Sequence, residues 1–477
     1  MFDDLREFIG KAKEIGEYKL VEGADWDLEI GAITDLQADT PNPPLLLFDK
    51  IKGYEAGYRV ASNLFNTATR TALALGLPLE VRGTELVKAL RDKIRGGVKT
   101  MSPVEVENGP VKENILVGDE VDVLKFPTPT WHELDGGRYI GTGDMVITKD
   151  PDEGWVNLGC YRVQIQDKST LTIFMAPGHH GGIMARKYWD RGLNCPVAIT
   201  CGQEPLLWFT SSLPLNWGVS EYDIAGGLRN KPVEVTKGVT TELPIPATAE
   251  IVLEGEIVPP EVESRVEGPF GEWSGYYAGG TRTEPAVRIK SILHRNAPII
   301  QGNPSHRLPS AYTLGRHIQR AAMLWDDLDR QLPGVRGVWQ VEETGLLSMI
   351  VISLKQHYAG HAKQASMVAA GSNATASGLR YIIVVDDDID PSNMSEVLWA
   401  LGTRSDPEAI DIVRGCWSSH TNPMLPPEKK ERREYGHSMA IILACRPYHW
   451  IKDFPPSTKP SPDLAKKIKE KWGELFL

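Results

Sequence analysis

The order of secondary-structure signals along the 477 residues constrains the fold more than any other feature. Residues 1–110 combine helix patterns with short strands, and residues 111–305 carry mostly strand patterns broken by Gly and Pro. The remainder returns to alternating strands and helices. Many short strands separated by turns are typical of a β-barrel or sandwich. The sequence therefore predicts a mixed α+β chain of several domains, since a domain averages roughly 150 residues.

Composition shifts and Pro-rich stretches place the expected domain boundaries. We expect an N-terminal α/β domain over 1–110, a central β-barrel domain over 111–305, a linker helix over 306–325, a C-terminal α/β domain over 326–455, and a C-terminal linker with an oligomerisation helix over 456–477. The last helix follows the stretch FPPSTKPSP and has apolar positions at helical spacing. It packs either on a partner subunit or on its own chain, and the pattern does not separate the two.

Several local patterns predict individual elements. Leu5, Phe8 and Ile9 fall on one face of a helix with Asp3 as its candidate N-cap. A second helix around 70–75 ends at Gly76. The alternation in AEIVLEGEIV predicts a strand with one apolar face, whereas RYIIVVDDDID and MAIILAC predict buried strands.

Charge and cysteine usage narrow the class of protein. The net charge of -11 and the sequence pI of about 5.6 argue against a nucleic-acid binder, which needs a basic face. The five cysteines form no Cys-x-x-Cys pair and are odd in number, which is typical of a reduced cytoplasmic protein. The acidic start MFDDLREF does not resemble a signal peptide, and no apolar run reaches the roughly 18 residues of a membrane helix. We expect a cytoplasmic protein without a nucleic-acid or membrane partner.

Two motifs in the central region carry side chains suited to anion and metal binding. In WVNLGCYR, Arg162 can hold a carboxylate through a bidentate pair, although a structural ion pair is the more frequent role of an arginine. In APGHHGG, His179 and His180 can present a ring nitrogen to a metal or phosphate. Neighbouring side chains on a strand point in opposite directions, so at most one of the two ligates a given ion. The alternative is a pair of solvated loop histidines.

Two further motifs add hydroxyl and carboxylate groups. The loop SSLPLNWGVSEYD offers Ser211 and Ser212 to a phosphate and Glu221 to a divalent ion, unless these residues only cap a helix. In EGPFGEWSG, Glu267 and Glu272 lie on one Gly-rich turn. A carboxylate kept from water there would have a raised pKa and could move a proton. Two exposed turn acids are the alternative.

The run VVDDDID places Asp386 and its neighbours at the end of a predicted buried strand, a frequent place for magnesium or phosphate. Solvation of a strand end is the preferred explanation, because no Gly-rich phosphate loop lies nearby. The sequence also lacks a Gly-x-Gly-x-x-Gly fingerprint, a Walker loop, a Gly-x-Ser-x-Gly elbow and a His-Glu-x-x-His motif.

Together, the order and spacing of these motifs resemble the UbiD family of reversible decarboxylases, which use prenylated FMN. The similarity also covers ASNLFNTATRTALALGLP near the N-terminus, ATAEIVLEGEI in the middle, and IIVVDDDIDP with LWALGTR in the last third. NLGCYR and EGPFGE carry the resemblance most specifically. It implies a central split β-barrel similar to flavin reductases, flanked by α/β parts, in a homodimer or homohexamer.

The resemblance also implies a set of binding residues. The ligands of a divalent ion, usually manganese, that also binds the flavin phosphate are matched by Asn157, His180 and Glu221. A monovalent-ion site, usually potassium (or sodium), is implied at Leu158, Thr210, Ser211, Leu213 and Glu221. The prenylated FMN, supplied by a flavin prenyltransferase, is expected to contact Asn157, Leu158, Gly159, Cys160, Tyr161, Arg162, His179, His180, Ser211, Ser212 and Glu221.

The activity implied is the reversible, non-oxidative decarboxylation of an aromatic, heteroaromatic or α,β-unsaturated carboxylic acid through a covalent adduct with the flavin. Arg162 would orient the substrate carboxylate, Glu267 would hold Arg162, and Glu272 would protonate the carbon that loses CO2. The position of His179 is often Gln in cinnamic-acid-type members, so His179 indicates an aromatic or heteroaromatic acid. The substrate pocket is expected to include His179 and Leu314. Candidates for the family's late lysine at the flavin phosphate are Lys429, Lys430, Arg432 and Arg433.

Three other functions compete with this interpretation. A flavin oxidoreductase on the same barrel would use ordinary FMN and a nicotinamide donor. A non-catalytic partner subunit or cofactor carrier is expected to lose network or metal residues, yet the chain keeps Asn157, Arg162, His180, Glu221, Glu267 and Glu272. A metal phosphohydrolase built on Asp386 to Asp388 would act without flavin.

Overall fold

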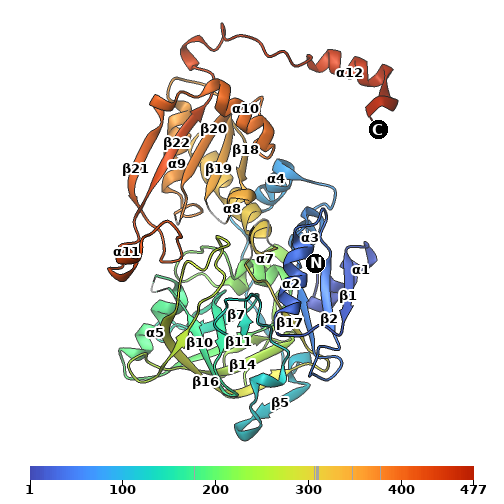
Figure 1. Cartoon of the computed structure of the whole chain (residues 1–477), viewed down its shortest axis with the longest axis vertical. Coiled ribbons are helices and arrows are strands. Elements are labelled where there is room, and N and C mark those ends of the chain that lie inside the picture. The colour runs from blue at the N-terminus through green and yellow to red at the C-terminus, as the bar shows by residue number, and fades with distance from the viewer. Residues whose placement is uncertain (177, 306, 308–310, 346–347, 377, 477) are drawn as a thin grey trace.

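Four β-sheets form the framework of the computed structural model, which describes residues 1–476 except 177, 306, 308–310, 346–347 and 377. The largest sheet has 10 antiparallel strands and curls into a half-barrel (Figure 1). A four-stranded sheet carries most of the N-terminal strands, a five-stranded sheet carries the C-terminal ones, and a small sheet has three strands. The chain therefore has the mixed α+β fold that the sequence predicts.

The central sheet runs in the order β6-β9-β10-β16-β14-β11-β7-β8, and both β5 and β15 pair with β16. Its strands are β5 (Asn114–Val117), β6 (Tyr139–Gly141), β7 (Met145–Lys149), β8 (Val156–Gly159), β9 (Arg162–Ile165), β10 (Thr170–Phe174), β11 (Cys195–Thr200), β14 (Ile251–Ile257), β15 (Ser264–Glu267) and β16 (Arg282–His294). The helices of this region are α5 (His180–Trp189), α6 (Pro205–Thr210) and α7 (Glu221–Arg229). The small sheet consists of β4 (Val104–Glu105), β12 (Glu234–Lys237) and β13 (Pro244–Pro246).

Strand β14 is buried on both faces, which corrects the expectation from its alternating sequence. Ile251 and Leu253 pack in one core, and Val252 packs in a second core on the opposite face. Glu254 is fully buried as well, because its carboxylate accepts the backbone N–H groups of Val239 and Thr241. The alternation of residues along β14 therefore separates side chains that face two different cores. On one of these faces the Glu254 carboxylate is buried together with its hydrogen-bond donors.

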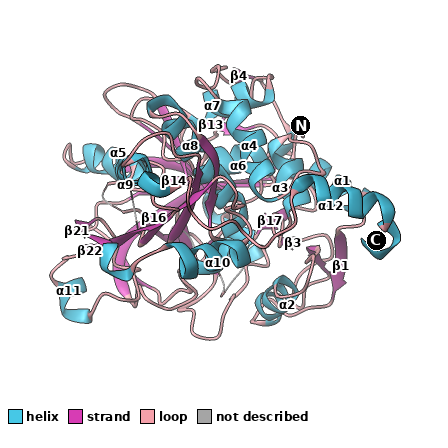
Figure 2. Cartoon of the chain, turned by 90° about the horizontal axis from the view of Figure 1, so that it is seen from above, coloured by secondary structure: helices cyan, strands magenta, loops and turns pink. Residues whose placement is uncertain are grey.

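The N-terminal sheet has the order β1 (Tyr18–Glu22), β2 (Leu45–Asp49), β3 (Arg59–Ser62) and β17 (Ile299–Gln301). Its last strand comes from the far end of the central region and pairs with β3 in parallel. The helices beside it are α1 (Leu5–Glu14), α2 (Glu29–Ala38), α3 (Ala68–Leu75) and α4 (Gly83–Ile94). Seen from above, α1 and α3 lie on one side of the central strands β14 and β16, and α5 lies on the other (Figure 2).

Helix α1 begins one residue later than its sequence suggests. The N-cap is Asp4, whose side chain accepts the N–H of Glu7 at 2.8 Å, so the prediction of Asp3 was wrong. The helix buries the predicted apolar face at Leu5 and Phe8. The helix predicted around 70–75 is α3, and it ends at Gly76 in the left-handed conformation, as expected.

The C-terminal region contains β18 (Val335–Gln340), β19 (Met349–Leu354), β20 (Tyr381–Asp386), β22 (His437–Ala444) and β21 (Asp411–Cys416), in that spatial order. Its helices are α8 (Ala311–Gln331), α9 (His361–Gly371), α10 (Met394–Arg404), α11 (Pro427–Glu431) and α12 (Pro462–Lys471). The long α8 contacts both α4 and β18, and one core cluster joins these elements. The first residues of the expected linker helix, 306 and 308–310, lie outside the described residues. The domain boundaries stay predictions.

The final helix α12 extends away from the rest of the chain (Figure 1). Its apolar positions are exposed, with Leu464 at 49% and Ile468 at 39%. These positions do not pack on the rest of the chain, and a single chain does not test packing on a partner subunit, so the oligomerisation role stays a prediction. Over the described residues, none of the helices combines the length and apolar character needed to cross a membrane.

Candidate active site

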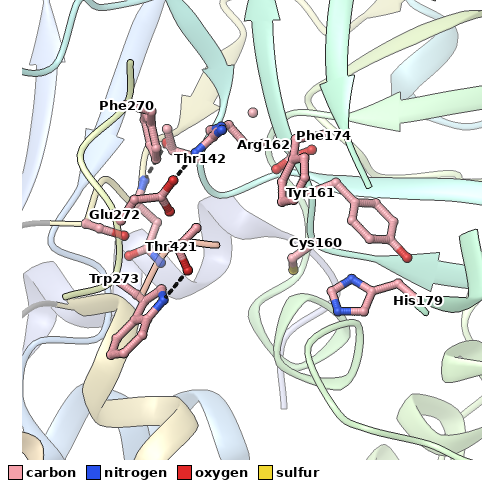
Figure 3. A pocket seen from close by; sticks show the side chains of 14 residues that line it. Thr142, Cys160, Tyr161, Arg162, Phe174, His179, Phe270, Glu272, Trp273 and Thr421 are labelled. Carbon is pink, nitrogen blue, oxygen red and sulfur yellow. Dashed lines mark hydrogen bonds and ion pairs between the residues drawn. The ribbon is translucent and has the colours of Figure 1, made fainter. Parts of the chain in front are cut away.

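A cavity of about 210 Å³ lies between the curled central sheet and the C-terminal region (Figure 3). Its walls come from segments far apart in the sequence, including the turn between β6 and β7, the junction of β8 and β9, and the loop after β15. The lining residues are Gly141, Thr142, Asp144, Cys160, Tyr161, Arg162, Phe174, His179, Phe270, Glu272, Trp273, Asn303, Ser305 and Thr421. Several residues predicted for the site thus share one cavity.

Arg162, the first residue of β9, forms ion pairs with both predicted acids. Its Nη1 donates to Oε1 of Glu272 at 2.6 Å, and its Nη2 donates to Oε2 of Glu267 at 2.8 Å. The Nε atom lies 2.7 Å from Oε1 of Glu267. The three side chains are 7%, 9% and 0% exposed for Arg162, Glu272 and Glu267, so these ion pairs are shielded from water. The structure brings the three residues together, as the sequence predicts.

Aromatic rings enclose this ionic group. The guanidinium carbon of Arg162 lies 5.2 Å from the ring centre of Phe174 and 5.1 Å from that of Phe270. Both rings line the cavity, as Figure 3 shows. Their faces attract the cation and keep the local dielectric low, which strengthens the ion pairs.

The two acids are held differently. Glu267 contacts Arg162 through both oxygens and also accepts the hydroxyl of Tyr139 at 3.1 Å, whereas Glu272 contacts Arg162 through one oxygen. Burial raises the pKa of Glu272 above its usual value, although the charge of Arg162 acts against this shift. Burial alone would lower the pKa of Arg162, but the two carboxylates raise it instead. Glu272 is therefore the better placed of the two acids to carry a proton.

A second charged cluster supports the loop that carries Glu272. The ring of His132 lies between two carboxylates, with Nε2 3.3 Å from Oδ2 of Asp35 and Nδ1 3.4 Å from Oδ2 of Asp135. Burial lowers the pKa of His132, but the close carboxylates of Asp135 and Asp35 outweigh it and raise the pKa to about 9. Oδ1 of Asp135 accepts the N–H of Gly271, the residue before Glu272, at 3.1 Å. The cluster thus joins α2 to the backbone of the loop.

The three predicted ligands of a divalent ion lie on three elements that meet. Asn157 lies on β8, and both α5 and α7 contact this strand. His180 and Glu221 are the first residues of α5 and α7. The Trp155 and Trp217 rings lie edge-on to the His180 ring at 5.5 and 5.3 Å between centres. The first residues of α5 and α7 thus place the imidazole of His180 and the carboxylate of Glu221 beside the strand that carries the amide of Asn157.

The chemistry of these groups fits a hard divalent cation. Glu221 is buried, and it accepts the N–H of Leu158 at 2.7 Å. Burial raises its pKa to about 8, which marks a carboxylate short of positive charge. Asn157 is 2% exposed, so its side-chain amide is kept from water beside this carboxylate. Amide, carboxylate and imidazole groups suit manganese or a similar ion.

The predicted loop with Ser211 and Ser212 forms the C-terminal end of helix α6. The Oγ of Ser211 donates to the carbonyl of Trp208 at 2.7 Å and lies 3.0 Å from Sγ of Cys160. Ser212 donates in the same way to Phe209, and the carbonyl of Thr210 accepts the N–H of Leu213 at 3.0 Å. These hydroxyls therefore complete a helix end in this structure, and their predicted roles toward phosphate and potassium stay predictions.

The remaining predicted residues divide into two groups. Cys160, Tyr161 and His179 line the cavity beside Arg162, and Leu158 and Gly159 are buried in β8. By contrast, Leu314 belongs to α8, is buried in the core, and is not among the residues that line the cavity. Among the basic candidates near the C-terminus, Lys430 donates a hydrogen bond from Nζ to the carbonyl oxygen of Ala278 at 2.5 Å. Ala278 lies in the loop that follows Glu272.

The acidic run at the end of β20 is a structural ion-pair network. Oδ2 of Asp386 lies 3.0 Å from Arg404 and 3.1 Å from Nε of Arg446, and Gln356 donates to its Oδ1 at 2.8 Å. Over the described residues, no cluster of three or more His, Cys, Asp or Glu side chains is arranged to hold a metal. The phosphohydrolase alternative therefore loses the acids on which it depended.

The sequence analysis missed several lining residues. Asp144 and Asn303 are 1% and 2% exposed, and Trp273 and Thr421 join two regions of the chain through a 2.8 Å hydrogen bond. The only sequence signal for Asp144 was an acid between the glycines of GTG and the strand MVIT. Nothing in the sequence marked Thr421.

Comparison with known proteins identifies the class. Models of 3-octaprenyl-4-hydroxybenzoate carboxy-lyase match in three parts: the N-terminal domain over 11–90, the Rift-related domain over 102–307 and the C-terminal domain over 313–444. The protein is a carboxy-lyase. It belongs to the UbiD family, as the resemblance of its motifs predicted.

Individual relatives agree with this assignment. The chain is 33% identical over 428 residues to phenolic acid decarboxylase of Bacillus subtilis, covering 86% of this chain and 87% of the relative. It is 32% identical to pyrrole-2-carboxylic acid decarboxylase of Pseudomonas aeruginosa, covering 93% and 90%.

Solved structures show the same fold. Vanillic acid decarboxylase of Sedimentibacter hydroxybenzoicus, in open form, superposes with a TM-score of 0.85 at 29% identity, covering 100% of this chain and 99% of that one. An evolved dimeric form of HmfF from Pelotomaculum thermopropionicum, in complex with prFMN, gives 0.81 at 29% identity, covering 97% and 98%.

The charged cluster at His132 predicts a pH-dependent contribution to stability. Because folding raises the pKa of His132 to about 9, its contribution is fully present below about pH 6.5 and is lost as pH rises through 9. His132→Gln should lower the free energy of unfolding by on the order of 3 kcal/mol at pH 6 and by much less at pH 10. Urea unfolding at both pH values measures this difference. The exposed His449 provides the control, since His449→Gln should leave both values unchanged. Parallel losses at the two pH values would contradict the ion-pair role.

Proposed function

We propose that the protein catalyses the reversible, non-oxidative decarboxylation of an aromatic or heteroaromatic carboxylic acid, or of an α,β-unsaturated one, with prenylated FMN as cofactor. The observation that carries the proposal is the buried ion-pair group of Arg162 with Glu267 and Glu272 at the wall of a cavity. It is supported by relatives named as decarboxylases of phenolic and pyrrole-2-carboxylic acids, and by a UbiD-class structure with prFMN.

The cofactor is proposed to lie in the cavity of the half-barrel, whose full architecture we take to be a split barrel similar to flavin reductases. When bound, prenylated FMN supplies an electron sink for the cleavage of the bond to CO2. Cys160, Tyr161 and Arg162 line this cavity and are the residues proposed to contact the flavin, together with the Ser211–Ser212 loop behind them. The phosphate would be held through a divalent ion on Asn157, His180 and Glu221, with potassium beside the same loop.

Arg162 binds the substrate carboxylate in this proposal. Its guanidinium is the cation at the cavity wall, held by Glu267 so that its position does not depend on the substrate. Phe174 and Phe270 offer flat apolar faces to an aromatic ring and exclude water from it. The substrate is thereby oriented at both its charged and its apolar end.

Glu272 delivers the proton in this proposal. Its raised pKa keeps a proton available, and its Oε1 lies 2.6 Å from the cation that binds the carboxylate. When CO2 leaves, the carboxyl of Glu272 protonates the carbon that carried it. In the carboxylation direction, the same carboxylate removes the proton from that carbon.

The first test is the dependence on prenylated FMN. The protein produced together with a flavin prenyltransferase should release CO2 from aromatic or heteroaromatic acids, whereas protein produced without it should be inactive. Hydroxybenzoic, pyrrole-2-carboxylic and furan-2-carboxylic acids form the screen, with CO2 release as the readout. Equal activity in both preparations would refute the proposal and favour an ordinary flavin enzyme.

Replacement of the proton donor should separate chemistry from binding. Glu272→Gln should lower kcat by about 10²–10⁴-fold, since general acid catalysis contributes that much, while the flavin still co-purifies. Glu263→Gln is the control and should keep the wild-type kcat, because Glu263 pairs with Arg288 and is not among the residues that line the cavity. The assigned role fails if Glu272→Gln turns over at the wild-type rate.

The adjacent histidines allow a paired test of the metal site. His180→Ala should reduce the affinity for manganese by at least about tenfold, because it removes a direct ligand. His179→Ala should retain manganese, because this ring lines the cavity instead. Metal analysis of both purified variants decides between the two positions, and full manganese in His180→Ala would contradict the ligand role.

A further inference from the structure

Two buried polar side chains in the cavity wall have atoms that the folded chain leaves unsatisfied. Asp144 is 1% exposed, and its Oδ2 has no hydrogen-bond partner over the described residues. Asn303 is 2% exposed, and both its Oδ1 and its Nδ2 are in the same condition. Both residues line the cavity. Buried polar atoms are almost always paired, so these three atoms require an explanation.

Other buried acids of the central sheet show what a structural role looks like. Glu254 is fully buried and accepts hydrogen bonds from Thr241, from backbone N–H groups and from the hydroxyl of Ser291 at 3.0 Å. Glu250, also fully buried, forms an ion pair with Arg6 at 2.8 Å. Asp144 lacks such a set of partners at Oδ2, and an unpaired buried carboxyl destabilises the fold. Asp144 therefore lowers the stability of the fold, and a structural role does not explain why a carboxyl is buried at this position.

Close packing of backbone holds the two side chains in one wall. Gly143 lies so near the segment of Asn303 that an added Cβ would be 2.8 Å from the carbonyl oxygen of Gln301 and 3.2 Å from Cβ of Asn303. The N–H of Asn303 donates to Oγ1 of Thr142 at 2.9 Å. An added Cβ on Gly141 would lie 2.6 Å from Cβ of Val163 and 2.8 Å from Oδ2 of Asp144, so glycine at this position lets the carboxyl pack tightly against β6. The two polar groups are thus preorganised rather than loose.

We propose that Asp144, assisted by Asn303, is a specificity-determining residue that accepts a hydrogen bond from an O–H or N–H group on the ring of the substrate. The inference rests on the proposed function and narrows it to acids that carry a ring hydroxyl or a ring N–H. A site built to bind such a donor rejects the isosteric molecule without it, because the carboxyl is then left buried and unpaired. Burial raises the pKa of Asp144 well above its usual value, and the positive charge of Arg316 acts against this shift. A carboxyl group keeps an acceptor oxygen in either protonation state.

Pairs of acids that differ only in the donor test this assignment without turnover. Pyrrole-2-carboxylic and furan-2-carboxylic acids form one pair, and 4-hydroxybenzoic and benzoic acids form the other. Calorimetry on FMN-loaded wild-type protein should show at least about tenfold tighter binding of the donor-bearing acid in one pair. Asp144→Leu removes both acceptor oxygens at similar size, and should reduce that preference to below about threefold. No preference in either pair, or the same preference in Asp144→Leu, overturns the proposal.

The flavin is the other possible source of an N–H donor, and FMN binding distinguishes it. The affinity for FMN, followed by fluorescence quenching, should be the same in Asp144→Leu and in the wild type. If it falls tenfold or more while the preference among acids is kept, Asp144 faces the flavin and the substrate assignment is wrong. Because these measurements need no catalysis, a wild-type protein that releases no CO2 would refute the proposed reaction but not this binding preference.

Thermal unfolding separates recognition from a structural role. Asp144→Asn should melt at the wild-type temperature or above it, because it removes an unsatisfied buried carboxyl. Glu254→Gln is the matched control and should melt at a lower temperature, since it disturbs a fully bonded buried acid. A comparable decrease in both variants would make Asp144 a structural residue and overturn the proposal.

Discussion

The buried guanidinium of Arg162 is the interaction on which the site depends. It joins the start of β9 to the end of β15 and to the loop that follows, and so it fixes two carboxylates at one wall of the cavity. Two carboxylates around one cation leave an excess negative charge when both are ionised. Burial makes that excess costly, and uptake of a proton relieves it. The same pairing that holds the group together thus favours the uptake of one proton, as the role proposed for Glu272 requires.

The charge around the cavity differs from the charge of the whole molecule. The net charge is -11, yet burial together with Arg282, Arg162 and Lys430 lowers the pKa of His420 to about 3. His420 lies beside Phe174, with 4.9 Å between ring centres, at the same end of the cavity. Several cationic side chains therefore gather near the cavity of an acidic protein, which the total charge alone would not reveal.

The parts of the site that could be predicted from the sequence were those with a compact local signature. Glu267 and Glu272 share one Gly-rich turn, and NLGCYR places Asn157 on β8 and Arg162 on β9, two strands that follow each other directly along the chain. Asp144 carried no such signature. The role proposed for it follows from a carboxyl oxygen without a hydrogen-bond partner, and only the tertiary fold decides which side chains have partners. Leu314 was expected in the pocket, but it packs in the core that α8 shares with α4 and β18.

For the fold, too, single elements could be predicted from the sequence, whereas contacts between distant segments could not. Helix and strand positions followed from periodicity, as for α3 and β20, because period reports which side of an element is apolar. The spacing of apolar residues does not show what packs against the opposite side of the element. Strand β14 has a second core there, and β17 leaves the central region to complete the N-terminal sheet. Both features depend on contacts between segments that are distant in sequence.

The hydrogen bond from Trp273 to Thr421 ties the loop of the acid to a distant part of the chain. Trp273 directly follows Glu272, and Thr421, 148 residues after Trp273, lines the same cavity. This restraint on the loop exists only when the C-terminal region is folded and docked on the central sheet. The geometry of the acid is therefore a property of the assembled chain and not of the central sheet alone.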